Sequence, residues 1–256
     1  MRIVALINQK GGVGKTTSTV SLGAALAKLN QKVVLIDLDS QRNLTKTIQS
    51  EDHHNRSIAD LIYNEASRLD YDPSQYIFRN KVEGLDYIPA SPMLASAPTI
   101  LATSNDSLRT LSTILHRDYF QRYDYILIDC RPSLDLLSVN ALAASDELIV
   151  PVEPEQYAVD ALGDLWASFE RTKTVNPGLR VNGILITKAD YRRKLTREIE
   201  ADLRQTFADT VYQTVLPMLS DAAKAASEQR STVQMKDSRL GNLYIEVAKE
   251  VMARCR

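Results

Sequence analysis

The sequence predicts an α/β fold in which a doubly wound, mostly parallel sheet is flanked by helices on both faces. Three observations lead to this fold class. Short runs rich in valine, isoleucine and leucine alternate along the chain with segments of helical periodicity. A glycine-rich segment at residues 10–17 joins the first apolar run to the first helical segment, and two later apolar runs end in aspartate. Polar motifs therefore follow the carboxyl ends of strands, where such sheets bind ligands.

The predicted strands are short and lie between polar or turn-forming residues. They are Arg2–Asn8, Lys32–Asp37, Leu85–Ile88, Tyr125–Asp129, Glu147–Val152, Arg180–Thr187 and Thr210–Leu216. Helical periodicity falls near residues 16–30, 56–64, 106–120, 134–144, 157–174, 194–208 and 239–254. Residues 49–80 are the least regular, so we expect a loop-rich insertion there. No repeat or linker divides the chain, so we expect residues 1–256 to form a single domain, with no helix-turn-helix domain before the first strand.

The composition is typical of a soluble globular protein, because 44% of the 256 residues are hydrophobic and 25% are charged. The formal net charge of −1 excludes a uniformly basic nucleic-acid coat, so such binding would need a local patch. No apolar run approaches the roughly 18 to 20 residues of a membrane span, and the chain begins with a strand pattern rather than a signal peptide. Cys130 ends a predicted buried strand and Cys255 is the penultimate residue, so we expect no disulfide and a cytoplasmic location.

The glycine-rich segment reads Lys10-Gly11-Gly12-Val13-Gly14-Lys15-Thr16-Thr17. A strand, a glycine-rich turn, Lys-Thr and a helix in this order predict a phosphate-binding loop. Glycines let backbone N–H groups approach the phosphates, and the helix N-terminus adds positive potential. We expect Lys15 to reach the β- and γ-phosphates and the Thr16 hydroxyl to bind Mg²⁺. The usual spacing has glycine where this chain has Gln9, and Lys10 is an additional lysine that lies too early to replace Lys15.

Three aspartates follow strands that we expect beside this loop. Asp37 and Asp39 end the second strand, and alternation places them on the same side of the extended chain. Such a pair is suited to position the waters of Mg²⁺ or to orient an attacking water, although a solvated strand end would look the same. Asp129 ends an apolar run in the Walker-B pattern, in which the aspartate supports the Mg²⁺ shell. Thr16, Asp39 and Asp129 are therefore the predicted metal-binding residues.

These motifs resemble those of the ParA-type, Soj-like members of the deviant Walker-A ATPases, a group of P-loop NTPases that includes MinD. The matching segments span nearly the whole chain, at residues 8–17, 37–43, 125–134, 149–152, 183–187 and 244–251. The resemblance implies ATP and Mg²⁺ as cofactors, weak ATP hydrolysis and a homodimer that sandwiches ATP. In this family the lysine that matches Lys10 reaches across the dimer to the partner's phosphates. Asp39 matches the acid that orients the hydrolytic water, and Asp129 matches the Walker-B acid.

Two segments depart from the family pattern. The family usually has Asp-Pro-Gln-Gly-Asn where this chain has Asp39-Ser40-Gln41-Arg42-Asn43, and Cys-Pro-Pro where it has Cys130-Arg131-Pro132. Losing glycine and proline changes the backbone freedom of these segments and adds two cations near the expected dimer face. The arginine-containing segment that often frames adenine is replaced by residues 217–224. The resemblance still places adenine near Thr187, Asp190 and Pro217.

A cluster of cations in the last third of the chain is the candidate DNA-binding surface. Residues 188–256 hold 13 lysines and arginines against 10 acids, a local balance of 13 − 10 = +3. The candidate residues are Arg192, Arg193, Lys194, Arg197, Lys224 and Arg230. A solvated helix face would show the same charges, but the resemblance implies ATP-dependent binding to the nucleoid without sequence preference. It also implies a ParB-like or other adaptor that stimulates hydrolysis, and a plasmid, a chromosome origin or a protein assembly as cargo.

The alternative is a MinD-like or other protein-recruiting ATP switch that does not bind DNA. Binding to a membrane surface would need an amphipathic helix, and the candidate is the C-terminal one, with a stripe formed by Leu240, Leu243, Tyr244, Val247 and Val251. Such a stripe is more typical of a helix packed on its own sheet. Glu246 and Glu250 also disfavour anionic lipid, so we do not expect a membrane partner.

Overall fold

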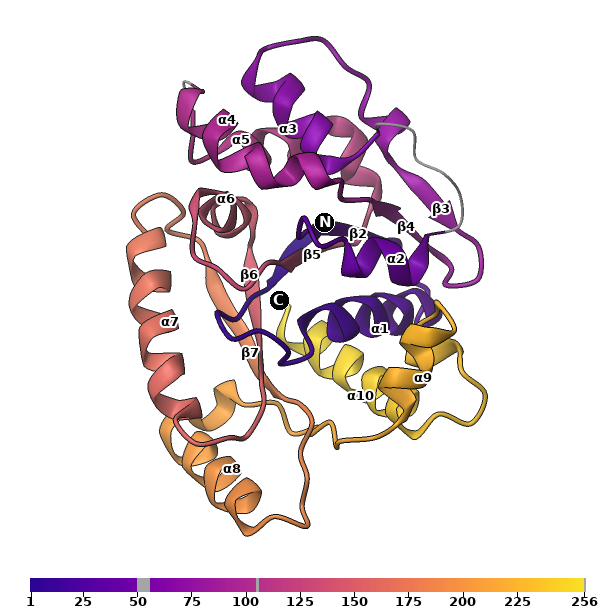
Figure 1. The fold of residues 1–256 in the computed structure, drawn as a ribbon, viewed down its shortest axis with the longest axis vertical. Helices are drawn as coiled ribbons and strands as arrows, with labels where there is room; N and C mark the ends of the chain where they lie inside the picture. The colour runs from indigo at the N-terminus through magenta and orange to yellow at the C-terminus, as the bar shows by residue number, and fades with distance from the viewer. Residues whose placement is uncertain (50–55, 105, 256) are drawn as a thin grey trace.

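A twisted, largely parallel sheet forms the centre of the molecule (Figure 1). The computed structural model describes residues 1–49, 56–104 and 106–255. Within them, seven strands pair in the order β3-β4-β2-β5-β1-β6-β7, all parallel to their neighbours except β3, which is antiparallel to β4. The strands are β1 (Arg2–Leu6), β2 (Val33–Leu38), β3 (Phe78–Asn80), β4 (Leu85–Ile88), β5 (Tyr125–Cys130), β6 (Glu147–Val152) and β7 (Arg180–Ile186). The predicted fold class is confirmed.

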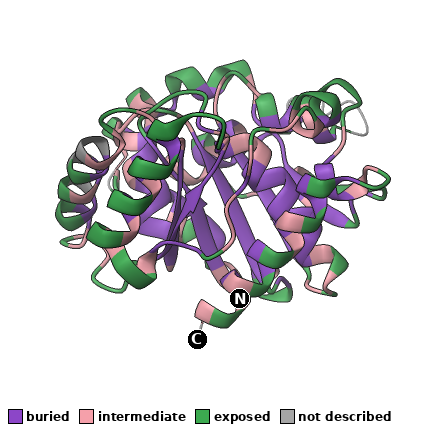
Figure 2. Ribbon diagram, turned by 90° about the horizontal axis from the view of Figure 1, so that it is seen from below, coloured by how far each residue is buried: buried purple, intermediate pink, exposed green. Residues whose placement is uncertain are grey.

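Helices cover both faces of the sheet, as parallel strands with apolar residues on both sides require (Figures 1 and 2). They are α1 (Lys15–Lys28), α2 (Asn43–Ile48), α3 (Ile58–Ala66), α4 (Ala97–Thr103), α5 (Thr110–Leu115), α6 (Leu136–Ala144), α7 (Ala158–Thr172), α8 (Lys194–Phe207), α9 (Asp221–Ser227) and α10 (Arg239–Arg254). Alternate residues of β1 face opposite sides of the sheet and pack in different hydrophobic cores. Ile3 and Ala5 pack with α3 to α6, whereas Val4 and Leu6 pack with α1 and α10.

Helix α10 packs on α1 and the sheet rather than presenting its apolar stripe to solvent. Leu240, Tyr244, Val247 and Val251 are buried in the same core as α1, and the Tyr244 hydroxyl lies 3.0 Å from Ser18 Oγ. This arrangement confirms the expectation that the stripe serves internal packing. Among the described helices, none is both long and apolar enough to cross a membrane.

The expected strand at Thr210–Leu216 is wrong. The chain instead forms a short 3₁₀ turn at Ala208–Thr210, followed by an extended segment that runs beside β7. Two ladder-like hydrogen bonds join this segment to β7, from the N–H of Tyr212 to the carbonyl of Ile184 (3.0 Å) and from Leu216 to Ile186 (2.9 Å). The apolar alternation was therefore real, but it marks an edge segment rather than another strand.

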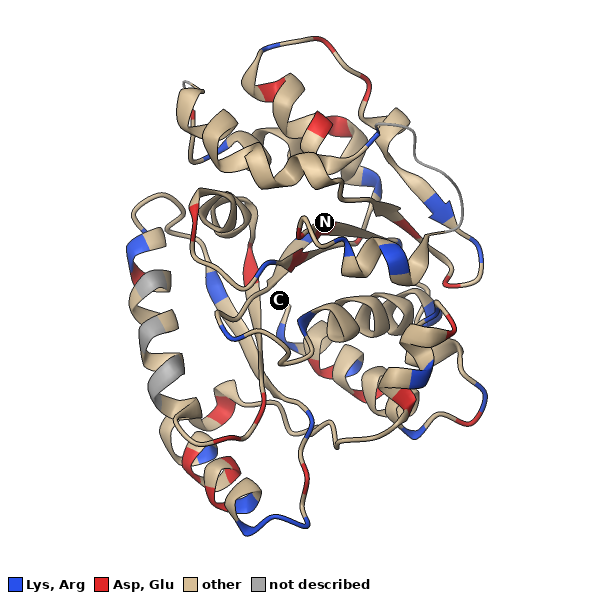
Figure 3. Cartoon of the chain, viewed as in Figure 1, with Lys and Arg blue, Asp and Glu red and all other residues tan. Residues whose placement is uncertain are grey.

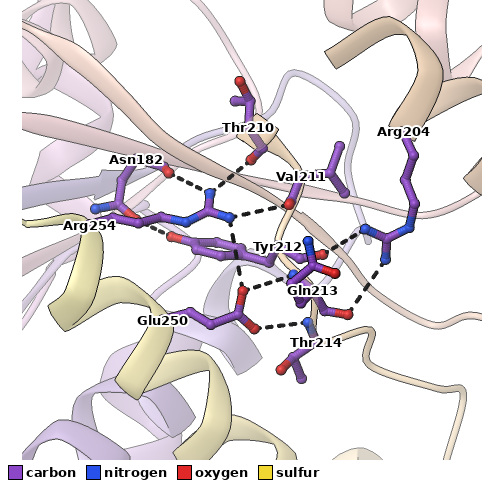
Figure 4. Close-up of polar contacts among 9 residues, drawn as sticks. All are labelled: Asn182, Arg204, Thr210, Val211, Tyr212, Gln213, Thr214, Glu250 and Arg254. Atoms are coloured by element: carbon purple, nitrogen blue, oxygen red, sulfur yellow. Dashed lines mark hydrogen bonds and ion pairs between the residues drawn. The ribbon is translucent and has the colours of Figure 1, made fainter. Parts of the chain in front are cut away.

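Two arginines take the place of a strand partner along this edge segment (Figure 4). The Arg254 guanidinium donates to the carbonyl groups of Thr210 (3.1 Å) and Val211 (3.2 Å) and lies over the Tyr212 ring. Arg204 donates to the Tyr212 carbonyl at 3.2 Å. Three consecutive carbonyl groups thus accept from side chains instead of from another strand, which leaves no need for a further ladder.

A carboxylate satisfies the neighbouring N–H groups. Glu250, on α10, accepts from the backbone N–H of Gln213 and of Thr214, both at 2.8 Å (Figure 4). These contacts hold the edge segment between α8 and α10 and fix the C-terminal helix to the sheet. Glu250 is therefore a structural residue. In the sequence it indicated only that the C-terminal helix would not favour anionic lipid.

Gly183 on β7 allows the Tyr212 ring to lie against the strand. A Cβ at position 183 would approach that ring to 2.5 Å, closer than any real contact. We expect Gly183→Ala to lower the free energy of unfolding by about 1–3 kcal/mol, measured by urea denaturation. The control is Gly163→Ala on the exposed side of α7, where no atom lies within 4 Å, and there a gain of about 0.5–1 kcal/mol is expected. Equal effects at the two positions would contradict the steric explanation.

Other differences concern short elements. In the segment 49–80, expected as a loop-rich insertion, residues 50–55 lie outside the described part. The helix expected near 56–64 is α3, and it buries Ile58, Leu61 and Ile62 in the core. The helix expected at 106–120 shortens to α5 and a 3₁₀ turn at Asp118–Arg122. Helices α2, α4 and α9 and strand β3 were not predicted, because elements of three to seven residues carry too little periodicity.

Candidate nucleotide-binding site

The loop between β1 and α1 is shaped to receive an anion. Gly12 and Gly14 adopt left-handed conformations, with φ of +78° and +87°, which turn the chain sharply into α1. Gly14 is the N-cap of α1, and neither a side-chain cap nor an acidic first-turn residue occupies that helix end. The first N–H groups of α1 are therefore available to a negatively charged ligand.

A hollow of about 650 Å³ opens beside this loop. It is large enough for a nucleotide. Its walls come from five parts of the chain that meet at one edge of the sheet: the loop itself, the segment after β2 with α2, the end of β5, the segment after β7, and helix α9 with the residues just after it. The lining residues are Gly11, Gly12, Gly14, Lys15, Thr16, Thr17, Asp39, Gln41, Asn43, Lys46, Thr47, Cys130, Pro132, Lys188, Ala226 and Gln229. Most of the residues predicted from the loop are thereby brought together.

Lys15 lies at the base of the hollow with 7% of its surface exposed. Its ammonium group donates to the carbonyl of Lys10 at 3.0 Å, so it curls back over the loop. Burial lowers the pKa of Lys15, and the charge of Asp129 opposes that shift. A cation held this way is poised to interact with phosphate oxygens.

Two of the three residues that the sequence predicted for a metal, Thr16 and Asp129, are in direct contact, and the third, Asp39, lines the hollow. The Thr16 hydroxyl donates to a carboxylate oxygen of Asp129 at 2.7 Å. Asp129 is buried, and burial together with Asp37 on the adjacent strand raises its pKa. A hydroxyl and one carboxylate match Mg²⁺, which takes oxygen ligands and in nucleotide sites keeps waters and phosphates as its other ligands. No cluster of three or more His, Cys, Asp or Glu suited to a metal occurs among the described residues.

Asp37 and Asp39 lie in different environments. Asp39 is partly exposed and lines the hollow, whereas Asp37 is fully buried and does not. The Asp37 carboxylate accepts hydrogen bonds from the N–H of Asp39 (3.1 Å) and from the N–H and hydroxyl of Thr45 (2.9 and 2.7 Å). Burial raises the pKa of Asp37 above its ordinary range. The two acids therefore do not act as a pair on one ligand.

Lys10 points away from the hollow. Its ammonium group forms an ion pair with Glu155 in the loop between β6 and α7, and the two side chains are 44% and 46% exposed. Its backbone N–H donates to Asn8 Oδ1 at 2.9 Å, and the Asn8 amide donates to the Pro151 carbonyl at 2.8 Å. The ion pair lowers the pKa of Glu155. Lys10 and Lys15 thus share a loop but face different surroundings.

The residues expected near adenine are only partly placed at the hollow. The Thr187 hydroxyl donates to the Val13 carbonyl at 2.8 Å, so both residues lie directly behind the loop. Asp190 forms ion pairs with the exposed Arg192 (2.7 Å) and with Arg193, which hold its pKa near 2. Pro217 pairs with Ala189 as an isolated bridge, which joins it to the end of β7. Asp190 and Pro217 do not line the hollow, and the adenine assignment stays a prediction.

The candidate DNA-binding cations form two separate groups (Figure 3). One group, at the start of α8, contains Arg192, Arg193, Lys194 and Arg197; the other, around α9, contains Lys224 and Arg230. Figure 1 shows α8 and α9 on different sides of the molecule. Acids accompany both groups, because Lys194 pairs with Glu198 (3.0 Å) and Arg230 pairs with Glu228 (3.2 Å).

The two arginines that depart from the family pattern, Arg42 and Arg131, differ in their structural effect. Arg42 adopts φ of +59°, the left-handed region that favours the glycine expected there, so the turn keeps its form at a cost of about 1 kcal/mol. Arg131 forms an ion pair with Asp135 at 3.1 Å.

Several residues that line the hollow were not predicted from the sequence. Lys188 lies two residues after the end of β7, at the sheet edge where ligands bind in such folds, and it pairs with Glu153 at 3.6 Å. Lys46 lies on the short helix α2, and Gln229 lies just after the short helix α9. No sequence motif marks either position.

The sheet order, the glycine loop and the Thr16–Asp129 pair define the class of protein, a P-loop nucleoside-triphosphate-binding protein of the α/β type. The profile of the family described as AAA domain matches residues 1–181. The chromosome-partitioning ATPase Soj of Thermus thermophilus is 38% identical over 256 residues, covering 99% of this chain and 96% of Soj. The sporulation initiation inhibitor protein Soj of Bacillus subtilis is 37% identical over 255 residues, covering 98% of each chain.

A solved structure shares the architecture. It is cobyrinic acid a,c-diamide synthase from Mycobacterium smegmatis with a bound ATP analogue and magnesium. It superposes with a TM-score of 0.79 at 29% identity, covering 97% of this chain and 93% of that one. With full-length relatives well above 30% identity, the chain belongs to the ParA/Soj-type partition ATPases of the MinD/ParA superfamily.

Proposed function

We propose that this chain hydrolyses Mg·ATP in a homodimer that closes around the nucleotide, and that the ATP dimer binds DNA without sequence preference to position a cargo. The observation that carries the proposal is the division between the two lysines of the loop. Lys15 is buried in the hollow, whereas Lys10 stands at the surface, held by the exposed Glu155. A lysine outside its own pocket is available to a second copy of the chain.

The residues of the hollow suit phosphoryl transfer. The loop N–H groups and Lys15 would bind the β- and γ-phosphates, which fixes the leaving group. Thr16 and Asp129 would hold Mg²⁺, which neutralises phosphate charge when bound. Asp39, the acid that lines the hollow, would accept a hydrogen bond from the attacking water and aim it at the γ-phosphate.

Lys10 of each subunit would complete the partner's site. On dimerisation it would leave Glu155 and approach the partner's phosphates, where it stabilises the charge that develops during transfer. Because this cation is present only in the dimer, hydrolysis is coupled to assembly. ATP would thus be both the substrate of hydrolysis and the ligand that controls dimerisation.

The Soj relatives support the partition role, since one is named as a chromosome-partitioning ATPase. We infer that the cations at α8 and α9 contact DNA phosphates in the ATP dimer, which doubles each group and places the protein on the nucleoid. A ParB-like or other adaptor would stimulate hydrolysis and link the dimer to its cargo. A switch that recruits proteins without touching DNA is the alternative outcome of the experiment below.

The test is a gel shift on DNA of arbitrary sequence with and without Mg·ATP. We expect an ATP-dependent shift at low salt, and Arg192→Glu/Arg193→Glu to weaken it at least about tenfold through the loss of phosphate contacts. Arg122→Glu, on the 3₁₀ turn Asp118–Arg122 outside both groups, makes the same Arg-to-Glu reversal at one site and is the control, which should bind normally. The absence of any ATP-dependent shift by the unaltered protein, with hydrolysis intact, would favour the protein-recruiting switch.

A further inference from the structure

We propose that Asp37 and Thr45 form a clasp that positions Asp39, although neither contributes to the wall of the nucleotide hollow. Asp37 is 0% exposed and Thr45 is 3% exposed, and they are hydrogen-bonded to each other across the segment that carries Asp39. The inference rests on the proposed function, since it takes Asp39 as the group that orients the attacking water. It assigns to Asp37 the task of holding a loop rather than binding metal or water.

The clasp grips both ends of one loop. At the start of the loop, Asp37 Oδ1 accepts the N–H of Asp39 at 3.1 Å. At its end, Asp37 Oδ2 accepts the N–H of Thr45 at 2.9 Å and the Thr45 hydroxyl at 2.7 Å. The Thr45 hydroxyl in turn accepts the N–H of Ala90, just after β4, at 2.9 Å. The carboxyl ends of β2 and β4 are therefore tied to each other through the loop.

The loop has little support of its own. Asp39 accepts a hydrogen bond from the Gln41 N–H through its side chain (2.9 Å) and from the Arg42 N–H through its carbonyl (2.9 Å). Arg42 stands in the left-handed conformation, and the helix that follows spans only Asn43–Ile48. The strained turn and short helix would relax if the buried clasp were opened, and Asp39 would move with them.

The phosphate-binding groups lie on another element. The loop at residues 10–17 connects β1 to α1 and shares no hydrogen bond with Thr45 among the contacts of the described residues. Opening the clasp should therefore misplace the catalytic acid without removing the groups that bind ATP. This separation predicts a fall in kcat with nucleotide affinity retained, a pattern that general loss of structure would not give.

The experiment compares Thr45→Val with Thr45→Ser. Valine keeps the shape but deletes the hydroxyl, so we expect kcat to fall about 10-fold or more with the Kd for a fluorescent ATP analogue within about twofold. Serine keeps the hydroxyl and should restore most of the turnover. Thr110→Val on α5 is the matched control and should hydrolyse ATP normally, because Thr110 is also 3% exposed and its hydroxyl donates to the Asp106 carbonyl at 3.0 Å, outside the site.

A second variant acts on the carboxylate itself. Asp37→Asn leaves a single acceptor oxygen where three donor groups converge, so it should lower kcat at least as far as Thr45→Val. Unchanged kcat in Thr45→Val and Asp37→Asn, with the unaltered protein active, would overturn the clasp. The clasp would also be overturned if the Kd for the ATP analogue rose in proportion to the fall in kcat. If the unaltered protein does not hydrolyse ATP, it is the proposed function that fails.

Discussion

Lys10→Ala is expected to lower ATP turnover about 10³-fold, because a cation supplied in trans to a phosphoryl-transfer site is worth at least that much. ATP binding to the isolated chain should stay nearly unchanged, since the Lys10 ammonium group contacts Glu155 rather than the hollow. The measurements are phosphate release at saturating Mg·ATP and the Kd for a fluorescent ATP analogue. Lys28→Ala, an exposed lysine at the far end of α1, is the control.

Mixing two inactive variants tests whether Lys10 acts across the dimer. In a mixed dimer of Lys10→Ala and Asp39→Ala, one site has both an intact Asp39 and the partner's intact Lys10. An equal mixture should therefore recover about one quarter of normal turnover, since half of the dimers are mixed and each has one working site. If Lys10 acts within its own subunit, no site is complete and no activity returns, which would contradict the assignment.

The fold could be predicted from the sequence where burial dictates the pattern. Strands such as β1 and β5 are buried on both faces, so their apolar runs are continuous and their ends are marked by polar motifs. The segment 210–216 shows why pattern alone fails at an edge. It has the apolar alternation of a strand, but Arg254, Arg204 and Glu250 satisfy its backbone, and they come from distant parts of the chain.

The site was predictable in its chemistry more than in its geometry. The glycine loop specifies its own conformation, so Lys15 and Thr16 lie where the sequence placed them. The difference between Asp37 and Asp39 depends on where Thr45 packs after the turn at Arg42, which no local pattern encodes. The ion pair of Glu155 could not be predicted either, because its partner Lys10 lies 145 positions away in the chain.

Asp129→Asn is expected to have opposite effects on activity and stability. Turnover should fall at least about 100-fold, because the variant loses the carboxylate that supports Mg²⁺. In the absence of nucleotide and Mg²⁺, the variant should nevertheless be more stable at pH 8, by at least about 1 kcal/mol. Asp129 is buried next to the buried Asp37, and removing one of two neighbouring carboxylates relieves the cost of burying charge. The Thr16 hydroxyl can still donate to the asparagine carbonyl.

The pH dependence of this difference follows from the raised pKa of Asp129 in the folded chain. Below about pH 4 the side chain is neutral in both folded and unfolded wild type, so the two proteins should differ little. As pH rises, the unfolded chain ionises first and the folded wild type loses stability until its own pKa is passed, whereas asparagine does not titrate. The advantage of Asp129→Asn should therefore grow with pH and then level off, as urea denaturation in EDTA would show. Asp70→Asn, at an exposed position after α3, supplies the baseline. A variant less stable than wild type at pH 8 would mean that attraction to Lys15 outweighs the burial of charge.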